Sequence, residues 1–302
     1  MKKILKWLAI VLGALVALVL LAAVGLLIYG QMRFKPTHAN RPLAAITADT
    51  SPEGLARGKY LMEGVMSCDK ACHSPEGRPF TGTVENINES PIQGVFAVPN
   101  LTPDQETGLG SWTDAEIARA IREGVDKDGV ELVVMPSYSY HVLSDADVAA
   151  IVGYLRSLEP VRNPIPPISV NAVGKVMGAL GLMGPRSLQA PITSSQISPK
   201  PGTVENGEYL VGLGECRGCH QPNLAGGTIP FAAPGTPPSA NLTPAGELVS
   251  WTATDFTRAV REGIAKSGRT LHEEMPRYQM TEADLADIFS YLQTLPPAES
   301  KY

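Results

Sequence analysis

The chain has 302 residues, of which 44% are hydrophobic and 18% are charged, so it has room for about two domains and is too apolar for a disordered polyelectrolyte. The formal net charge is −5, but residues 1–40 contain five basic and no acidic residues, which leaves a net charge of −10 on the rest. This acidic body excludes a nucleic-acid partner, which needs a basic surface, and is compatible with basic or neutral protein partners.

An uncharged stretch of 23 residues, from Trp7 to Tyr29, lies near the N-terminus. As a helix rising about 1.5 Å per residue it could cross a hydrocarbon layer of about 30 Å, with an aromatic ring at each interface. A cleaved secretory signal is the alternative, but its apolar region is shorter, about 7 to 15 residues. Three lysines precede the stretch, so residues 1–33 are predicted to form a cytoplasmic tip and a single-pass anchor in a bacterial inner membrane. Everything after the anchor would be periplasmic.

After a linker over residues 34–53, the chain repeats itself, because residues 54–159 match residues 203–296. The first unit is residues 54–159, and the second unit is residues 203–302. The matching segments are Gly58, Tyr60 and Leu61 with Gly207, Tyr209 and Leu210; Asn100 to Pro103 with Asn241 to Pro244; Trp112-Thr113 with Trp251-Thr252; Arg122 to Gly124 with Arg261 to Gly263; and Met135-Pro136 with Met275-Pro276. Each unit is marginal in size for a domain held by an apolar core alone, so an additional element in the core is expected.

Both units are predicted to be helical. A first helix is expected over about residues 52–66 and 206–213, and Gly124 and Gly263 are placed to end the middle helices. Capping boxes mark the other helix starts, at Thr113 with Glu116, Ser144 with Asp147, Thr252 with Asp255, and Thr281 with Asp284. No convincing strand alternation appears, so the predicted fold is all-α: an N-terminal transmembrane helix followed by two tandem helical domains.

The two units are joined by residues 160–202, whose many prolines predict a linker without regular structure that lies over a surface. Within it, Val170 to Met183 is mostly apolar and contains a single charge, Lys175. We expect this segment to pack between the two domains. Docking on a partner and lying on the membrane surface are the alternatives.

All four cysteines fall in two clusters that end in histidine, Cys68 to His73 and Cys216 to His220. The second has the spacing Cys-x-x-Cys-His, which is the attachment signature of c-type haem. In this chemistry the two thiols add to the two vinyl groups of the porphyrin, and the adjoining histidine is an axial ligand of the iron. The pattern therefore predicts two covalently bound haem c groups, with His73 and His220 as iron ligands.

Three other kinds of site compete with this interpretation. A disulfide framework does not explain the two histidines, a thioredoxin-like motif requires a βαβ pattern, and zinc knuckles usually lie closer together than these clusters. The first cluster departs from the signature, because three residues rather than two separate Cys68 from Cys72. The extra residue would have to bulge out of the connecting turn, and attachment through Cys72 alone is the alternative.

The sixth ligand of each iron would be a thioether or an imidazole further along the same unit. The candidates are Met135 and His141 in the first unit, and His272, Met275 and Met280 in the second. Only methionine followed by proline occurs at matching positions, so Met135 and Met275 are the predicted distal ligands. The alternative is that each is a core methionine that fills a gap.

Two further repeated features could contact the haem. Trp112 and Trp251 precede matching helices, and their ring N–H groups could bind a haem propionate, although core packing explains them equally well. The repeated Asn-Leu-Thr-Pro segments could shape the haem edge, or could be simple turns.

On these residues the chain resembles the class I cytochrome c family in a membrane-anchored, dihaem form. The chain is similar, more closely, to cytochrome subunits of periplasmic alcohol, sugar or aldehyde dehydrogenases. The similarity lies in the order of its motifs: an Asn-Leu-Thr-Pro turn, Trp-Thr, Arg-Glu-Gly, Met-Pro and a final helix with Tyr-Leu. The resemblance implies a helical bundle around each haem, with the first and last helices crossing near Gly58 and Tyr154. It also implies His73 with Met135 on one iron and His220 with Met275 on the other. Many such subunits carry three haems, whereas this chain has two clusters.

The expected function is therefore single-electron transfer in the periplasm, between a dehydrogenase or other donor and a respiratory-chain acceptor, with no catalytic residue on this chain. One alternative is a dihaem peroxidase or oxidase in which one iron has an open face, with His272 and Met280 as the residues involved. Another is an assembly subunit whose anchor recruits a dehydrogenase.

Overall fold

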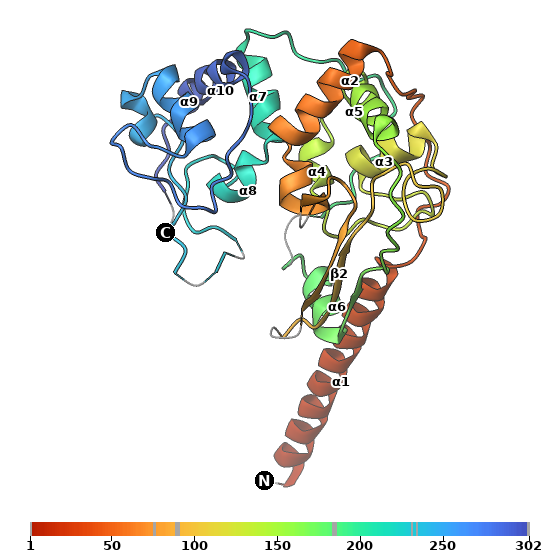
Figure 1. The fold of residues 1–302 in the computed structure, drawn as a ribbon. Coiled ribbons are helices and arrows are strands. Elements are labelled where there is room, and N and C mark those ends of the chain that lie inside the picture. Colours follow the sequence, from red (N-terminus) through yellow and green to blue (C-terminus); the bar gives the residue numbers. More distant parts are fainter. Residues whose placement is uncertain are drawn as a thin grey trace.

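Figure 1 shows a long N-terminal helix that leads into two groups of helices. The computed structural model describes residues 2–74, 77–87, 91–182, 186–230, 232–233 and 235–300. In and around the first unit the elements are α1 (Lys2–Met32), α2 (Pro52–Lys59), the π-helical segments η1 (Tyr60–Val65) and η2 (Asp69–His73), β1 (Thr83–Ile87), β2 (Gly94–Val98), α3 (Asp114–Glu123), α4 (Ser137–Tyr140) and α5 (Asp145–Ser157). The linker and the second unit contain β3 (Ser169–Val170), α6 (Ala172–Ala179), α7 (Val204–Leu213), α8 (Cys216–His220), the 3-10 helix η4 (Glu247–Ser250), α9 (Ala253–Glu262) and α10 (Glu282–Thr294).

Helix α1 is exposed along most of its length and becomes buried only near its C-terminal end, at Gly30. Within the described residues it is the single helix that is long and apolar enough to cross a membrane. The predicted helix over Trp7 to Tyr29 is confirmed, and its bare apolar surface suits contact with lipid.

The first and last helices of each unit cross at a glycine. A Cβ atom on Gly58 of α2 would lie 2.1 Å from the carbonyl oxygen of Ala150 in α5, and one on Gly207 of α7 would lie 2.1 Å from that of Asp287 in α10. Only glycine permits backbones to approach this closely. The crossing expected near Gly58 is confirmed, and the second unit repeats it.

The helix ends follow the predicted caps, with one informative exception. Helices α3 and α9 begin with complete capping boxes and end at Gly124 and Gly263, both in the left-handed conformation with φ of 68° and 72°. At the starts of α5 and α10, the hydroxyls of Ser144 and Thr281 accept the expected bonds from the amides three residues later. The cap amides themselves, however, donate to tyrosines of the opposite unit rather than to the acids of the predicted boxes.

These two tyrosines lie in the interface between the units and make matching bonds across it. The Tyr209 hydroxyl accepts a hydrogen bond from the backbone N–H of Ser144 at 3.1 Å and donates to the Asp147 carboxylate at 2.7 Å. The Tyr60 hydroxyl makes the same two bonds at the start of α10, at 3.0 Å from the cap amide and 2.5 Å from the Asp284 carboxylate. Because Tyr60 and Tyr209 hold matching positions in the repeat, the exchange is reciprocal, as at a two-fold interface.

The structure corrects the expectation that strands are absent. A small antiparallel sheet has the order β1-β2-β3, although the chain is mostly helical. A Cβ atom on Gly94 would lie 2.0 Å from the carbonyl oxygen of Ser169, so glycine is required where β3 joins β2. Three consecutive residues of β1 are exposed, so the alternation by which a strand is recognised in a sequence is weak.

The linker also contains regular structure, contrary to the prediction, and its apolar segment packs against α1 rather than between the units (Figure 1). A Cβ atom on Gly30 would lie 2.2 Å from the carbonyl oxygen of Lys175 in α6. At the end of α1, the Arg33 guanidinium lies 2.6 Å from the buried Glu131 carboxylate of the first unit. Met183, the last residue of the predicted segment, lies outside the described residues. The linker thus joins the N-terminal helix to the first unit.

Substitution of Tyr209 by phenylalanine tests the tyrosine exchange. Tyr209→Phe removes a donor from the buried Asp147 carboxylate and an acceptor from the Ser144 amide, so we expect the free energy of unfolding to fall by about 1–3 kcal/mol. Denaturant unfolding of the full chain in detergent measures this. Tyr60→Phe should cost less, because that side chain is partly exposed and water can replace the bond. Unchanged stability of Tyr209→Phe would mean that the exchange does not hold the units together.

Candidate functional site

The two cysteine clusters fold differently. The second cluster is a short α-helix, α8, whereas residues Asp69–His73 of the first form the π-helical segment η2. A π-helical turn accommodates one additional residue within a helix. The extra residue between Cys68 and Cys72 is therefore absorbed in a widened helical turn, and does not bulge from a loop as the sequence suggested.

A second insertion of the same kind precedes the first cluster. The offset between matching residues is 149 at Leu61 and 147 at Cys72, so the first unit holds two additional residues in this interval. The π-helical segments η1 and η2 provide one widened turn each. These local insertions leave the helix crossings and the histidines of the two units in equivalent places.

His73 and His220 are both buried, and each is oriented by a backbone carbonyl. The Nδ1 atom of His73 lies 3.0 Å from the carbonyl oxygen of Pro99, and that of His220 lies 2.7 Å from the carbonyl oxygen of Ala240. A carbonyl can only accept, so Nδ1 carries the proton and Nε2 presents a lone pair. Burial lowers the pKa of His73 to about 4 and lowers that of His220, so both imidazoles are neutral at pH 7. A neutral imidazole with one fixed nitrogen is what a metal-ligating histidine requires.

The repeated Asn-Leu-Thr-Pro segments hold these two carbonyls in place. In the first unit the side chain of Asn100 accepts from the backbone N–H of Thr102 at 3.0 Å and donates to the carbonyl oxygen of Val161 at 2.7 Å. Asn241 makes the equivalent bonds in the second unit, to Thr243 at 2.9 Å and Ala298 at 2.7 Å. Pro99 and Ala240 directly precede these asparagines, so the segment orients the histidine, a role that the sequence left open.

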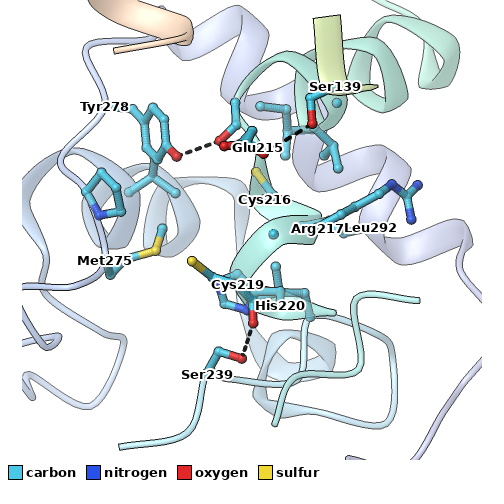
Figure 2. Close-up of a pocket in the computed structure, with 18 of the residues that line it drawn as sticks. Ser139, Glu215, Cys216, Arg217, Cys219, His220, Ser239, Met275, Tyr278 and Leu292 are labelled. Atoms are coloured by element: carbon cyan, nitrogen blue, oxygen red, sulfur yellow. Dashed lines mark hydrogen bonds between the residues drawn. The ribbon is translucent and has the colours of Figure 1, made fainter. Parts of the chain in front are cut away.

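A cavity of about 1390 Å³ lies mainly in the second unit and reaches the first unit at Ser67, Val134 and Tyr138. Cys216, Cys219, His220 and Met275 line it, and Figure 2 shows Met275 pointing toward Cys219 across the cavity. Most of its other lining residues are apolar, and its volume exceeds the roughly 300–1,000 Å³ that is usual for small-molecule pockets. A large, apolar cavity with two thiols and a neutral imidazole fits a covalently attached porphyrin.

The four cysteines are not paired with one another but differ in their exposure. All four cysteines are free of disulfides, which argues against a disulfide framework. Burial raises the pKa of Cys68 and of Cys216 to about 12, so these thiols stay protonated at neutral pH. Cys72 is exposed, which leaves it accessible for attachment.

The other candidate ligands occupy distinct surroundings. Met135 and Met275 are both partly buried against the apolar core. His141 binds the carbonyl oxygen of Arg122 through Nδ1 at 3.0 Å, and His272 is exposed. Met280 also lines the cavity but is only 1% exposed, as a core side chain is.

Both tryptophans pack against the core as partly buried side chains. Trp251 also lines the cavity, and the backbone carbonyl oxygen of Trp112 accepts a hydrogen bond from Arg156 at 2.5 Å. Sequence reasoning missed Glu215 and Tyr138. Their hydrogen bond of 2.6 Å joins the two units beside the cavity. The only sequence signal for Glu215 is its position directly before Cys216.

Removal of the Asn100 side chain should loosen the carbonyl that orients His73. Asn100→Ala leaves the Thr102 amide without its acceptor and removes one of the two donors to the Val161 carbonyl in a buried turn, so we expect a loss of about 1–3 kcal/mol in the free energy of unfolding. Thermal or denaturant unfolding measures the loss. Asn163→Ala is a control on a half-buried asparagine of the adjoining linker, and should cost less. Equal losses would argue that the turn has no special role.

Comparison with known proteins agrees with this geometry. The cytochrome c family model matches the chain twice, over residues 55–159 and 204–296. The cytochrome c subunit of alcohol dehydrogenase (quinone) from Gluconacetobacter polyoxogenes is 29% identical over 287 residues, covering 84% of this chain and 58% of that protein. The gluconate 2-dehydrogenase cytochrome c subunit of Pantoea cypripedii is 32% identical over 189 residues, 59% of this chain and 41% of that subunit.

A diheme cytochrome c-type protein of Cereibacter sphaeroides is 29% identical over 229 residues, which is 68% of this chain and 73% of that protein. The chain thus spans only part of the length of the dehydrogenase subunits that it resembles, 58% in the alcohol dehydrogenase case. The two matched regions coincide with the two units that carry a cysteine cluster, a buried histidine and its carbonyl. The chain belongs to the cytochrome c family.

Proposed function

We propose that the chain is a membrane-tethered dihaem cytochrome c that carries single electrons between a periplasmic dehydrogenase and a respiratory-chain acceptor. The observation that carries this proposal is that both units contain one and the same arrangement. A cysteine pair precedes a buried neutral histidine, and a backbone carbonyl binds its Nδ1 atom at 3.0 Å in the first unit and 2.7 Å in the second. Two such arrangements within one chain support two haems and transfer between them.

The proposed ligand sets are Cys68, Cys72, His73 and Met135 in the first unit, and Cys216, Cys219, His220 and Met275 in the second. A haem c bound in this way supplies an iron that gains and loses one electron. The histidine is held in one orientation by its carbonyl, and the soft methionine sulfur favours the ferrous state and so raises the potential. Trp251, and Trp112 in the first unit, are proposed as N–H donors to propionates.

The N-terminal helix is proposed as a single-pass inner-membrane anchor. The bare apolar surface of α1, with Trp7 and Tyr29 near the ends of its uncharged stretch, supports this. The lysines before the stretch favour a cytoplasmic N-terminus, and the two units would then lie in the periplasm. The proposed domain boundaries are the ones that the sequence predicts, with anchor, linker, first domain, proline-rich linker and second domain in that order.

The proposed electron donor is a dehydrogenase. Several relatives are named as cytochrome subunits of alcohol, fructose and gluconate dehydrogenases. In such an arrangement the substrate chemistry belongs to the partner, and the tasks of this chain are to hold, tune and shield its redox groups. Its acidic surface favours a basic or neutral partner face.

The intact mass of the mature chain tests the haem content. We expect the mass of the chain to exceed that of the polypeptide by two covalently bound porphyrins. When Cys216 and Cys219 are both replaced by alanine, the excess should correspond to one porphyrin, because each unit attaches its own group. Intact-mass spectrometry of the purified protein, together with the c-type absorption bands of the reduced form, provides the measurement. An unmodified mass would refute the proposed function.

The distal ligand of the second unit is tested by Met275→Ala. With one ligand removed, carbon monoxide should bind about half of the haem in the reduced protein, and the midpoint potential of that unit should fall. Optical titration measures both effects. Met280→Leu is the matched control, because the first unit carries Leu143 at the corresponding core position. Binding of carbon monoxide to the unaltered protein would favour an enzyme with an open haem face.

Deletion of residues 2–28, behind a cleavable export signal, tests the anchor. Gly30 and Arg33 remain, so the contacts of the chain with α6 and Glu131 are kept. We expect a protein that leaves the membrane fraction but retains its visible spectrum, because α1 alone would hold it to lipid. Cell fractionation followed by absorption spectroscopy measures this. A shortened protein that stays in the membrane fraction would contradict the assignment.

A further inference from the structure

Glu215 lies at the junction of the two units, directly before the first cysteine of the second cluster. Its carboxylate accepts hydrogen bonds from the Tyr138 hydroxyl at 2.6 Å and from the Ser139 hydroxyl at 3.3 Å, and both donors belong to helix α4 of the first unit. Figure 2 shows Ser139 reaching toward Glu215 on the side of the cavity where Cys216 lies. The carboxylate is thus attached to the backbone of one unit and fixed by side chains of the other.

The same carboxylate lies beside both cysteine clusters. In the second unit it directly precedes Cys216 and lines the cavity together with Cys219. On the side of the first unit, its two hydrogen-bond donors lie three and four residues after Met135, and Ser67, which directly precedes Cys68, lines the same cavity. One acidic group is therefore close to the attachment sites of both proposed haems.

The placement of Glu215 is unfavourable for a residue with only a structural task. Its φ of 55° puts it in the left-handed region, where a long side chain is disfavoured. Burial raises the pKa of its carboxyl, while the hydrogen bonds from Tyr138 and Ser139 lower it. The interface already has the reciprocal bonds of Tyr60 and Tyr209. A half-buried acid in the left-handed region at such a place calls for a functional explanation.

The first unit offers a comparison within the same chain. Ser67, the residue before Cys68, is also in the left-handed region, with φ of 51°. The backbone conformation therefore belongs to both clusters, but only the second cluster carries an acid there. The acid, rather than the turn, is what distinguishes this position.

We propose that Glu215 is a positioning residue that stabilises the oxidised state of both haems at once and so lowers their two potentials together. This inference rests on the proposed function, since it requires a haem in each unit. Loss of an electron leaves one more positive charge at an iron, and a nearby anion in a medium of low dielectric favours that state.

The shared position has a consequence for transfer between the haems. Transfer of one electron from the reduced haem to the oxidised haem leaves the total charge of the two haems unchanged. An anion near only one haem would lower the potential of that haem alone, and would therefore oppose electron transfer to it from the other haem. An anion near both lowers each potential relative to outside partners, and adds little to the difference between them.

Glu215→Gln in the full chain, purified in detergent, tests the proposal. Glutamine keeps the size of the side chain and its ability to accept from Tyr138, but it removes the charge. Potentiometric titration followed by optical spectra should show both midpoint potentials rising by similar amounts. Glu215→Ser, which copies Ser67, should raise both as well, and provides a second variant if glutamine impairs folding. A rise in only one potential, or in neither, would overturn the proposal.

Two controls separate charge from structure. Glu215→Asp keeps the charge at a position that aspartate tolerates, and should leave both potentials close to those of the unaltered protein. Tyr60→Phe removes a hydrogen bond between the units of the same kind at the start of α10, and should also leave them unchanged. A rise in either control equal to that of Glu215→Gln would overturn the proposal. Porphyrin mass is measured for every variant, because a missing haem in the unaltered chain would refute the proposed function instead.

Discussion

The hydrogen bond between a buried histidine and a backbone carbonyl is the constraint around which each unit of this chain is built. It fixes the tautomer and the ring orientation of His73 and His220, and burial keeps both rings neutral. The carbonyls are in turn positioned by asparagine turns that are bonded to the chain beyond the last helix, at Val161 and Ala298. The proposed ligand histidine near the start of each unit thus depends on backbone that lies nearly a whole unit later.

Duplication gave the chain two copies of a site and also an interface between them. The helix that begins each unit supplies a tyrosine to the cap of the last helix in the other unit, and this reciprocal exchange joins them. The same contact brings α4 of the first unit to the cysteine cluster of the second, where Tyr138 and Glu215 meet. The interface therefore determines how the two proposed haems are placed relative to each other, which no single unit could specify.

A third set of contacts joins the N-terminal helix α1 to the first unit. Helix α6 of the linker packs at Gly30, and Arg33 pairs with a carboxylate whose side chain is only 1% exposed. A second arginine, Arg186, approaches the same carboxylate at 3.0 Å. Breaking one partner from a buried pair of this kind is more costly than breaking a surface pair. The first unit is consequently held to α1, and the second follows it through the tyrosine interface.

The sequence by itself determined the class of site and most of the local structure, because these depend on residues close together in the chain. The spacing of Cys216, Cys219 and His220 predicts haem attachment, the hydroxyl and glycine caps locate the helices, and the uncharged stretch from residue 7 to 29 predicts the long helix. The repeated Asn-Leu-Thr-Pro segment was visible, but its role was not, since the carbonyl it holds is identified only by the histidine that contacts it.

Tertiary structure decided what depends on distant residues. The acids of two predicted capping boxes bind tyrosines of the opposite unit, because a hydroxyl from more than 60 residues away reaches the cap. The sheet forms because Gly94 admits a strand from the linker, and α6 packs on α1 because Gly30 leaves room for its backbone. Glu215 lies beside both clusters for the same reason: a single acidic residue has no pattern along the chain, and its importance comes from the side chains that the fold places around it.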